Sequence, residues 1–472
     1  MMAESSRAVS PTRATFDAFA ERLWLLCLFF IPLLVDLLAQ APYFGFQTRL
    51  YPATLQAATI VAAFFILLLY VTPSPKILET FSGAWQRRAL MVFCFLCALM
   101  TFPFMGGTLS FPLRIVFGIF AALFLVLVIR NPASLFWFFL LAVAYSFLQR
   151  TRFLNAVEIR TEFSDILPLI EQAGKNFLAG NDPYIFYSLP LNLPLVYLPI
   201  TWASYVPTLA AQIDIRFTNL AAEFGIVLIF LSLVYKWRHL PAANLAFGYA
   251  AFLLVLPTAM FWDSFTAHPI WWFWLLLSVR LLIARRFGLW AIAMGVTLAT
   301  SQLALVVLPV FGIFVLRDIG LPRALLYFAI LVGVALLIVA PFAYRNPFDF
   351  LNDTLLYYAD LKNYGKILWE YDQRWQYILG FGGEAWRRGF PDALRWVQGA
   401  LIVILAALYA FRFRNTTTNV LRVATVTLGF FLLFSAVVWQ YYFQAVFYLL
   451  LFFVSMVVIP QERRTGDVEY RT

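Results

Sequence analysis

Charged residues, cysteines and histidines are all scarce in this chain of 472 residues. Asp, Glu, Lys and Arg make up 12% of it, whereas about 25% is usual in a soluble domain, so an ordinary water-soluble fold is excluded. The three cysteines lie inside apolar runs, which excludes a disulfide scaffold. The two histidines, His239 and His268, are expected on opposite faces of a membrane, so no zinc site is predicted.

Apolar side chains dominate what is present. They make up 63% of the chain, and the mean hydropathy is +0.82. A helix needs about 20 apolar residues to cross a bilayer, and we interpret about fourteen runs as spans. We therefore predict an all-α fold, a polytopic bundle with two large outer-face loops that carry short helices. Within residues 288–316, the polar break Thr300-Ser301-Gln302 favours two short helices over one long tilted helix.

Basic connectors between the apolar runs indicate the orientation. Every second connector carries Arg or Lys, as in Arg87-Arg88 and Arg285-Arg286, and the positive-inside rule places these connectors in the cytoplasm together with the N-terminal tail. The same rule explains the net charge of +10 without a nucleic-acid partner. The chain then divides into an N-terminal membrane region of about five spans (1–149), a first outer loop with interfacial helices (150–216), central spans (217–343), a second outer loop (344–396), and C-terminal spans with a cytoplasmic tail (397–472).

The first outer loop holds a helix, a turn and a proline-rich apolar segment. The pattern predicts a helix over Asp165–Ala179 that ends at Gly180, followed by the turn Asn181-Asp182-Pro183-Tyr184. The segment Leu189–Ala211 is interrupted by four prolines, so we interpret it as re-entrant or interfacial and not as a span. Asp165 is a carboxylate at the outer interface, where it could accept a proton from a hydroxyl. It could equally be an acid that stabilises the start of a helix.

Taken together, Ser164-Asp165, Gly180-Asn181-Asp182-Pro183-Tyr184 and Leu193-Pro194-Leu195-Val196-Tyr197-Leu198-Pro199 resemble the first-loop signature of the glycosyltransferase-C superfamily. The resemblance is closest to glycosyltransferase family 87, the polyprenyl-phosphate-mannose-dependent mannosyltransferases, and covers roughly residues 150–458. It implies that Asp165 is the catalytic base and that Asn181 and Tyr184 belong to the substrate-binding turn. Five predicted spans precede the loop here, whereas relatives place it after the first span.

The chemistry that this resemblance implies needs cations for a phosphate and polar groups for a sugar. Arg216 and Arg374 are candidates for the phosphate, because guanidinium groups suit its oxygens. Interfacial anchoring is the alternative for both. Asp214 and Asp263 are further binding candidates and, with Asp165, could hold a divalent cation, although no metal ligand set is predicted.

Four other polar residues lie within or next to apolar runs in the second half of the chain or shortly before it. His268 could contact the phosphate or the sugar, or could be an interfacial histidine. Gln302 lies in the polar break, and Gln440 lies in Trp439-Gln440-Tyr441-Tyr442 before the last apolar run. Glu223 lies about two turns inside a predicted span, and we expect Arg216 or Asn219 on the same helix face to be its partner.

These features predict an integral-membrane, inverting glycosyltransferase. It would move a hexose, with mannose as the sugar that the resemblance implies, from a polyprenyl-phosphate donor to a lipid or glycan acceptor. The expected location is a bacterial plasma membrane, with the site on its outer face. The alternative is a secondary transporter or lipid flippase, but transporters concentrate polar residues near mid-membrane and often show two related halves. A structural assembly subunit would leave Asp165 without a task.

Overall fold

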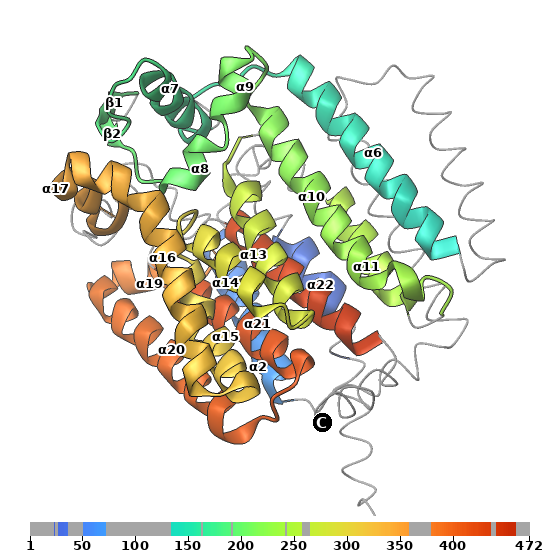
Figure 1. Ribbon diagram of the computed structural model, residues 1–472. Coiled ribbons are helices and arrows are strands. Elements are labelled where there is room, and N and C mark those ends of the chain that lie inside the picture. Colours follow the sequence, from blue (N-terminus) through green and yellow to red (C-terminus); the bar gives the residue numbers. More distant parts are fainter. Residues whose placement is uncertain are drawn as a thin grey trace, which may run out of the picture.

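In the computed structural model, the part of the chain that is described consists mostly of helices (Figure 1). The structure describes residues 23, 27–35, 51–71, 134–161, 164–189, 192–240, 243–256, 265–357, 379–435 and 440–458. The predicted all-α class is confirmed. The helices that form the bundle are α2 (Tyr51–Val71), α6 (Ser134–Ala156), α10 (Arg216–Val234), α11 (Ala243–Val255), α13 (His268–Ile283), α14 (Phe287–Leu298), α15 (Ala304–Ile319), α16 (Leu321–Arg345), α20 (Pro391–Arg412), α21 (Thr417–Leu433) and α22 (Gln444–Val458).

The expected count of about fourteen spans is not supported. Among the described residues, three helices are long and apolar enough to cross a membrane: Arg216–Trp237, Leu321–Arg345 and Asp392–Arg412. Other apolar helices are 10–17 residues long. At 1.5 Å per residue, such a helix covers about 15–26 Å, less than the roughly 30 Å of a hydrocarbon core. An apolar run in the sequence therefore also marks a short helix packed inside the bundle.

The first outer loop folds into short elements, drawn in the green part of the ribbon in Figure 1. Its helices are α7 (Ile166–Leu178), α8 (Pro199–Ala203) and α9 (Val206–Ala210), and its antiparallel strands are β1 (Phe186–Ser188) and β2 (Asn192–Pro194). The predicted helix and its stop are confirmed, since Gly180 adopts a φ of +80° that suits glycine. The proline-rich segment Leu189–Ala211 contains β2, α8 and α9 and no spanning helix, so no described part of it crosses the membrane as one helix.

These outer elements have a hydrophobic core of their own. Tyr184 and Trp202 are at most 2% exposed and lie at its centre. Phe342 of α16 contacts the Trp202 ring edge-on, with centroids 5.3 Å apart, and Phe350 contacts the Tyr184 ring at 4.7 Å. The core thus joins the first outer loop to the second, which begins with α17 (Pro347–Leu351) and the π-helix η3 (Asn352–Leu356). Burial of these large rings fixes the outer loop against the bundle.

Two short helices replace one long helix over residues 288–316, as the polar break predicts. Helix α14 ends at Leu298 and α15 begins at Ala304. Thr201 donates a hydrogen bond to the carbonyl of Thr300 (2.6 Å), and the backbone N–H of Ile200 donates to the carbonyl of Ala299 (3.1 Å). These bonds satisfy carbonyls that the end of α14 leaves without helical partners. The break is therefore the point where the outer loop is attached to the bundle.

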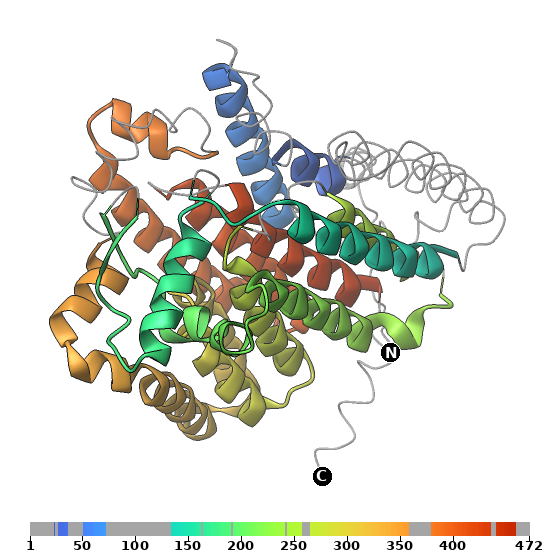
Figure 2. The ribbon, with the colours of Figure 1, turned by 90° about the horizontal axis from the view of Figure 1, so that it is seen from above.

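A buried ion pair joins α6 to α10, which lie side by side in Figures 1 and 2. It consists of Arg150 and Glu223, whose side chains are 1% and 2% exposed. The expected partners of Glu223, Arg216 and Asn219, are both engaged elsewhere, so that prediction is wrong. The partner of Glu223 comes from a neighbouring helix, whereas we expected a partner on the same helix from the spacing of residues along it.

Three further short helices of the described part border the bundle helices. Helix η2 (Tyr235–Trp237) extends α10, α19 (Gly382–Arg387) precedes α20, and η6 (Gln440–Phe443) precedes α22. Arginine side chains close two helix ends here: Arg317 donates to the carbonyls of Tyr409 and Phe413 at the end of α20, and Arg422 donates to the carbonyl of Leu69 in α2. A guanidinium at a helix C-terminus satisfies orphan carbonyls and suits the helix dipole.

Candidate functional site

A cavity of about 410 Å³ lies where the first outer loop meets the ends of the bundle helices. Asp165, His268 and Gln302, which the sequence places in three separate stretches, all line it. The remaining polar lining comes from the first outer loop, the α14–α15 break, the start of the second outer loop, α20, and the segment around η6: Tyr197, Thr201, Thr300, Ser301, Thr354, Tyr357, Arg395, Gln398, Ser435, Tyr441 and Tyr442. Among the described residues, the cavity thus combines one carboxylate, one imidazole and one guanidinium with hydroxyl and amide groups.

Asp165 reaches the cavity from the N-terminal end of α7. It occupies the N-cap position, yet its side chain makes no capping hydrogen bond to the helix. The hydroxyl of Ser164 instead accepts a bond from the backbone N–H of Ile166 (3.3 Å). The carboxylate of Asp165 therefore does not cap the helix, whereas an aspartate at the N-cap position usually accepts a hydrogen bond from a backbone N–H of the first turn.

The negative charge of Asp165 contributes to the raised pKa of Tyr357, a residue that was not a candidate from the sequence. Burial, together with the charges of Asp165 and Asp353, raises the pKa of Tyr357 to about 12. Tyr357 follows η3 and lines the same cavity. Its phenol is protonated at neutral pH and can donate a hydrogen bond.

His268 is the first residue of α13 and is 7% exposed. Its imidazole packs edge-on against the rings of Tyr441 and Tyr442, with centroids 4.7 and 4.4 Å away, and these two rings stack on each other at 4.9 Å. Its Nδ1 atom has no hydrogen-bond partner among the described residues. A buried nitrogen without a partner is unusual, which marks this wall of the cavity as a place for a polar ligand or water.

The chain before His268 is held by a hydrogen-bonded bridge. Asn219 of α10 accepts a bond from the Tyr205 hydroxyl and donates one to the carbonyl of Thr266 (2.7 Å). All three residues are buried. The bridge ties α9, α10 and the start of α13 together and so fixes the position of His268.

Gln302 connects two walls of the cavity. Its side-chain amide donates to the carbonyl of Thr354 in η3, across 52 positions in the chain. Asp353, next to Thr354, is 1% exposed, and burial raises its pKa to about 6. It does not line the cavity itself, but it belongs to the wall that Gln302 holds in place.

Tyr184 lies behind the cavity wall and not in the cavity. It is 2% exposed, donates a hydrogen bond to the carbonyl of Tyr197 (2.9 Å) and accepts one from the indole N–H of Trp202 (3.2 Å). Burial raises its pKa well above the usual value, so it stays protonated. Since Tyr197 lines the cavity, Tyr184 acts on the site by positioning its neighbour. Asn181 is exposed in the turn and does not line the cavity.

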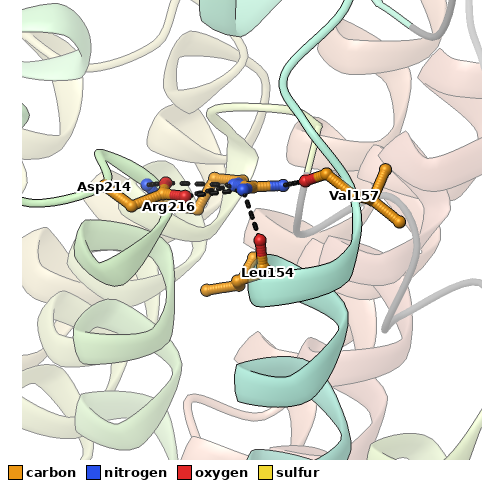
Figure 3. A network of polar contacts seen from close by, with 4 residues as sticks. All are labelled: Leu154, Val157, Asp214 and Arg216. Atoms are coloured by element: carbon orange, nitrogen blue, oxygen red, sulfur yellow. Dashed lines mark hydrogen bonds and ion pairs between the residues drawn. The ribbon is translucent and has the colours of Figure 1, made fainter. Parts of the chain in front are cut away.

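Asp214 and Arg216 form a network away from the cavity, drawn in Figure 3. The guanidinium of Arg216 contacts the Asp214 carboxylate through Nε (3.0 Å) and Nη2 (2.5 Å). It also donates to the carbonyls of Leu154 (2.8 Å) and Val157 (2.7 Å) at the end of α6. The side chain of Arg216 is 3% exposed, so the structure uses it to join α6 to the start of α10.

Replacing Arg216 with lysine separates this structural role from phosphate binding. Lysine keeps the charge but cannot reach the carboxylate and two carbonyls with one planar fork. We expect Arg216→Lys to lower the free energy of unfolding by about 2 kcal/mol, measured as a lower melting temperature of the purified protein. The affinity of the folded variant for a lipid phosphate should not change, and a selective loss of that affinity would contradict the structural assignment.

The other candidate residues are only partly described. Asp263 and Arg374 lie outside the described residues, and of Gln440 the structure describes the backbone, at the start of η6. In the described ranges, no group of three or more His, Cys, Asp and Glu side chains is placed to hold a metal ion. Of the three carboxylates considered for a divalent cation, Asp165 lines the cavity and Asp214 pairs with Arg216.

Arg395 and Gln398 of α20 are cavity residues that the sequence analysis missed. Arg395 lies at the end of the predicted second outer loop (344–396), and Gln398 follows that loop. Asp392 and Arg395 are the charged residues in the first two turns of a largely apolar helix. Such a pattern is also typical of interfacial anchors, so it did not indicate a functional role by itself.

Comparison of the chain with models of protein families, with curated proteins and with solved structures finds no match.

Proposed function

We propose that the protein is an integral-membrane, inverting glycosyltransferase that transfers a hexose from a polyprenyl-phosphate donor to a lipid or glycan acceptor. One observation carries the proposal: Asp165, His268 and Gln302, chosen from separate stretches of sequence, line one cavity. A carboxylate, a polar wall and stacked aromatic rings are what a sugar-transfer site needs. The proposed location is a bacterial plasma membrane, with the cavity on the outer face.

The proposed reaction is a single displacement at the anomeric carbon. The acceptor hydroxyl forms the new C–O bond while the bond to the phosphate oxygen breaks, and its proton passes to the carboxylate of Asp165. Polyprenyl phosphate leaves with the bonding electron pair. His268 and Gln302 would bind hydroxyl groups of the sugar, and Tyr441 and Tyr442 would provide a ring surface for it.

Transfer of a labelled sugar tests the proposal directly. Membranes that contain the full chain are incubated with polyprenyl-phosphate sugars labelled in the sugar, mannose first, and lipid and glycan fractions are then separated. We expect label to move into a product with inversion at the anomeric carbon. Matched membranes without the protein are the control. No transfer from any hexose donor, with the protein folded, would contradict the proposal.

The buried pair of Arg150 and Glu223 is the observation that favours the alternative, a secondary transporter or lipid flippase. Ionisable groups inside a helical bundle often belong to an ion or substrate path. The pair lies between α6 and α10 and lines no part of the cavity that holds Asp165. Uptake of labelled lipid or ions into vesicles in the absence of sugar transfer would support this alternative.

A further inference from the structure

Arg395 is the only arginine or lysine among the described residues that line the cavity. It lies in the second turn of α20, and its side chain is 43% exposed. It makes a contact of 3.7 Å with Asp392, three positions earlier on the same helix. A guanidinium is always charged and carries five N–H donors in a fixed fork, so it suits the oxygens of an anion that enters the cavity.

Gln398 extends this end of the cavity by one helical turn. Residues three positions apart lie on the same helix face, and both side chains line the cavity. Gln398 donates a hydrogen bond to the carbonyl of Phe431 in α21 (3.0 Å), which orients its amide. The two side chains thus come from one rigid helix whose position is fixed by its neighbour.

The same helix exposes most of its apolar length. Residues Asp392–Arg412 are long and apolar enough to span a membrane, and 22% of this apolar stretch is buried inside the protein. Trp396, Val403 and Ile404 are more than half exposed. Because Arg395 lies near the start of the same helix and lines the cavity, a lipid chain along the exposed face of α20 would have its head group at the cavity.

We infer that Arg395 and Gln398 form the phosphate-binding end of the cavity and hold the head group of a polyprenyl-phosphate lipid whose chain lies along α20. This inference rests on the proposed function and adds the site of the leaving group. The carboxylate of Asp165 and the guanidinium of Arg395 line the same cavity. A positive group at the leaving phosphate stabilises the charge that develops there, while a negative group accepts the proton.

Lipid binding by the full chain tests the inference without turnover. The purified protein is titrated with polyprenyl phosphate, and bound lipid is measured by native mass spectrometry. We expect Arg395→Gln to weaken binding about tenfold or more, and Arg395→Lys to recover part of it because lysine keeps the charge but not the fork. Arg388→Gln is the matched control, since Arg388 pairs with Glu384 on the neighbouring helix α19 and does not line the cavity.

Two further probes distinguish a lipid head group from free phosphate. Polyprenol, which lacks the phosphate, should bind equally weakly to the wild-type protein and to Arg395→Gln. Inorganic phosphate at the same concentration should not compete; full competition would overturn the lipid assignment. Equal binding of polyprenyl phosphate to wild type and Arg395→Gln would overturn the inference while sugar transfer, measured separately, still supports the function. A wild-type protein that neither binds the lipid nor transfers sugar would overturn both.

Discussion

Asp165→Asn should abolish sugar transfer while the protein still folds and binds its donor. Asparagine keeps the shape of the side chain but cannot accept the proton of the attacking hydroxyl. Removal of a general base lowers turnover by about 10²–10⁴-fold, so we expect kcat to fall by about a thousandfold. Transfer of labelled sugar and binding of polyprenyl phosphate, measured on the same preparation, check the two halves of this expectation.

Glu171→Gln is the matched control for this experiment. Glu171 belongs to the same helix, α7, but it pairs with Lys175 (2.6 Å) and does not line the cavity. An exposed pair of this kind contributes little to stability, so the control should keep full activity. Undiminished transfer by Asp165→Asn would remove the carboxylate from the mechanism. Loss of donor binding along with transfer would give Asp165 a binding role instead.

Local signals in the sequence predict the parts of the fold that depend on neighbours in the chain. The start and stop of α7 follow from Asp165 and Gly180, and the break between α14 and α15 follows from three consecutive polar residues. Each of these features is set by backbone preferences and by unsatisfied groups at a helix end. Asp165 was a candidate because of the loop motif around it, and His268 and Gln302 because each is a polar group at the edge of an apolar run.

Contacts between distant segments were beyond this kind of prediction. Arg216 looks like a phosphate ligand by charge alone, but its partners include carbonyls 59 and 62 positions away. Arg395 lines the same cavity as Asp165 only because α20 packs against α15 and α21 in the folded bundle. The count of about fourteen spans is not supported among the described residues for a related reason, because an apolar run facing lipid and one facing other helices have the same composition.

Breaking the buried ion pair between α6 and α10 should have the largest effect on stability. Glu223→Leu leaves the guanidinium of Arg150 buried without its carboxylate, in a position where the side chain is 1% exposed. Removal of one partner from such a pair costs about 3–5 kcal/mol. We expect a strongly reduced yield of folded protein and a melting temperature well below that of the wild type. Leu228→Ala, on the same helix and half exposed, is a suitable control.

The double variant Arg150→Met/Glu223→Leu tests whether the ion pair serves only to hold the two helices together or also takes part in function. Replacing both charges with apolar groups of similar size removes the desolvation penalty, so stability should return to the wild-type value or exceed it. Because the pair lines no part of the cavity, the refolded double variant should also transfer sugar at the wild-type rate. A stable double variant that loses uptake of labelled lipid or ions into vesicles would instead assign these charges to transport, since an ion path needs the charges themselves and a helix contact does not.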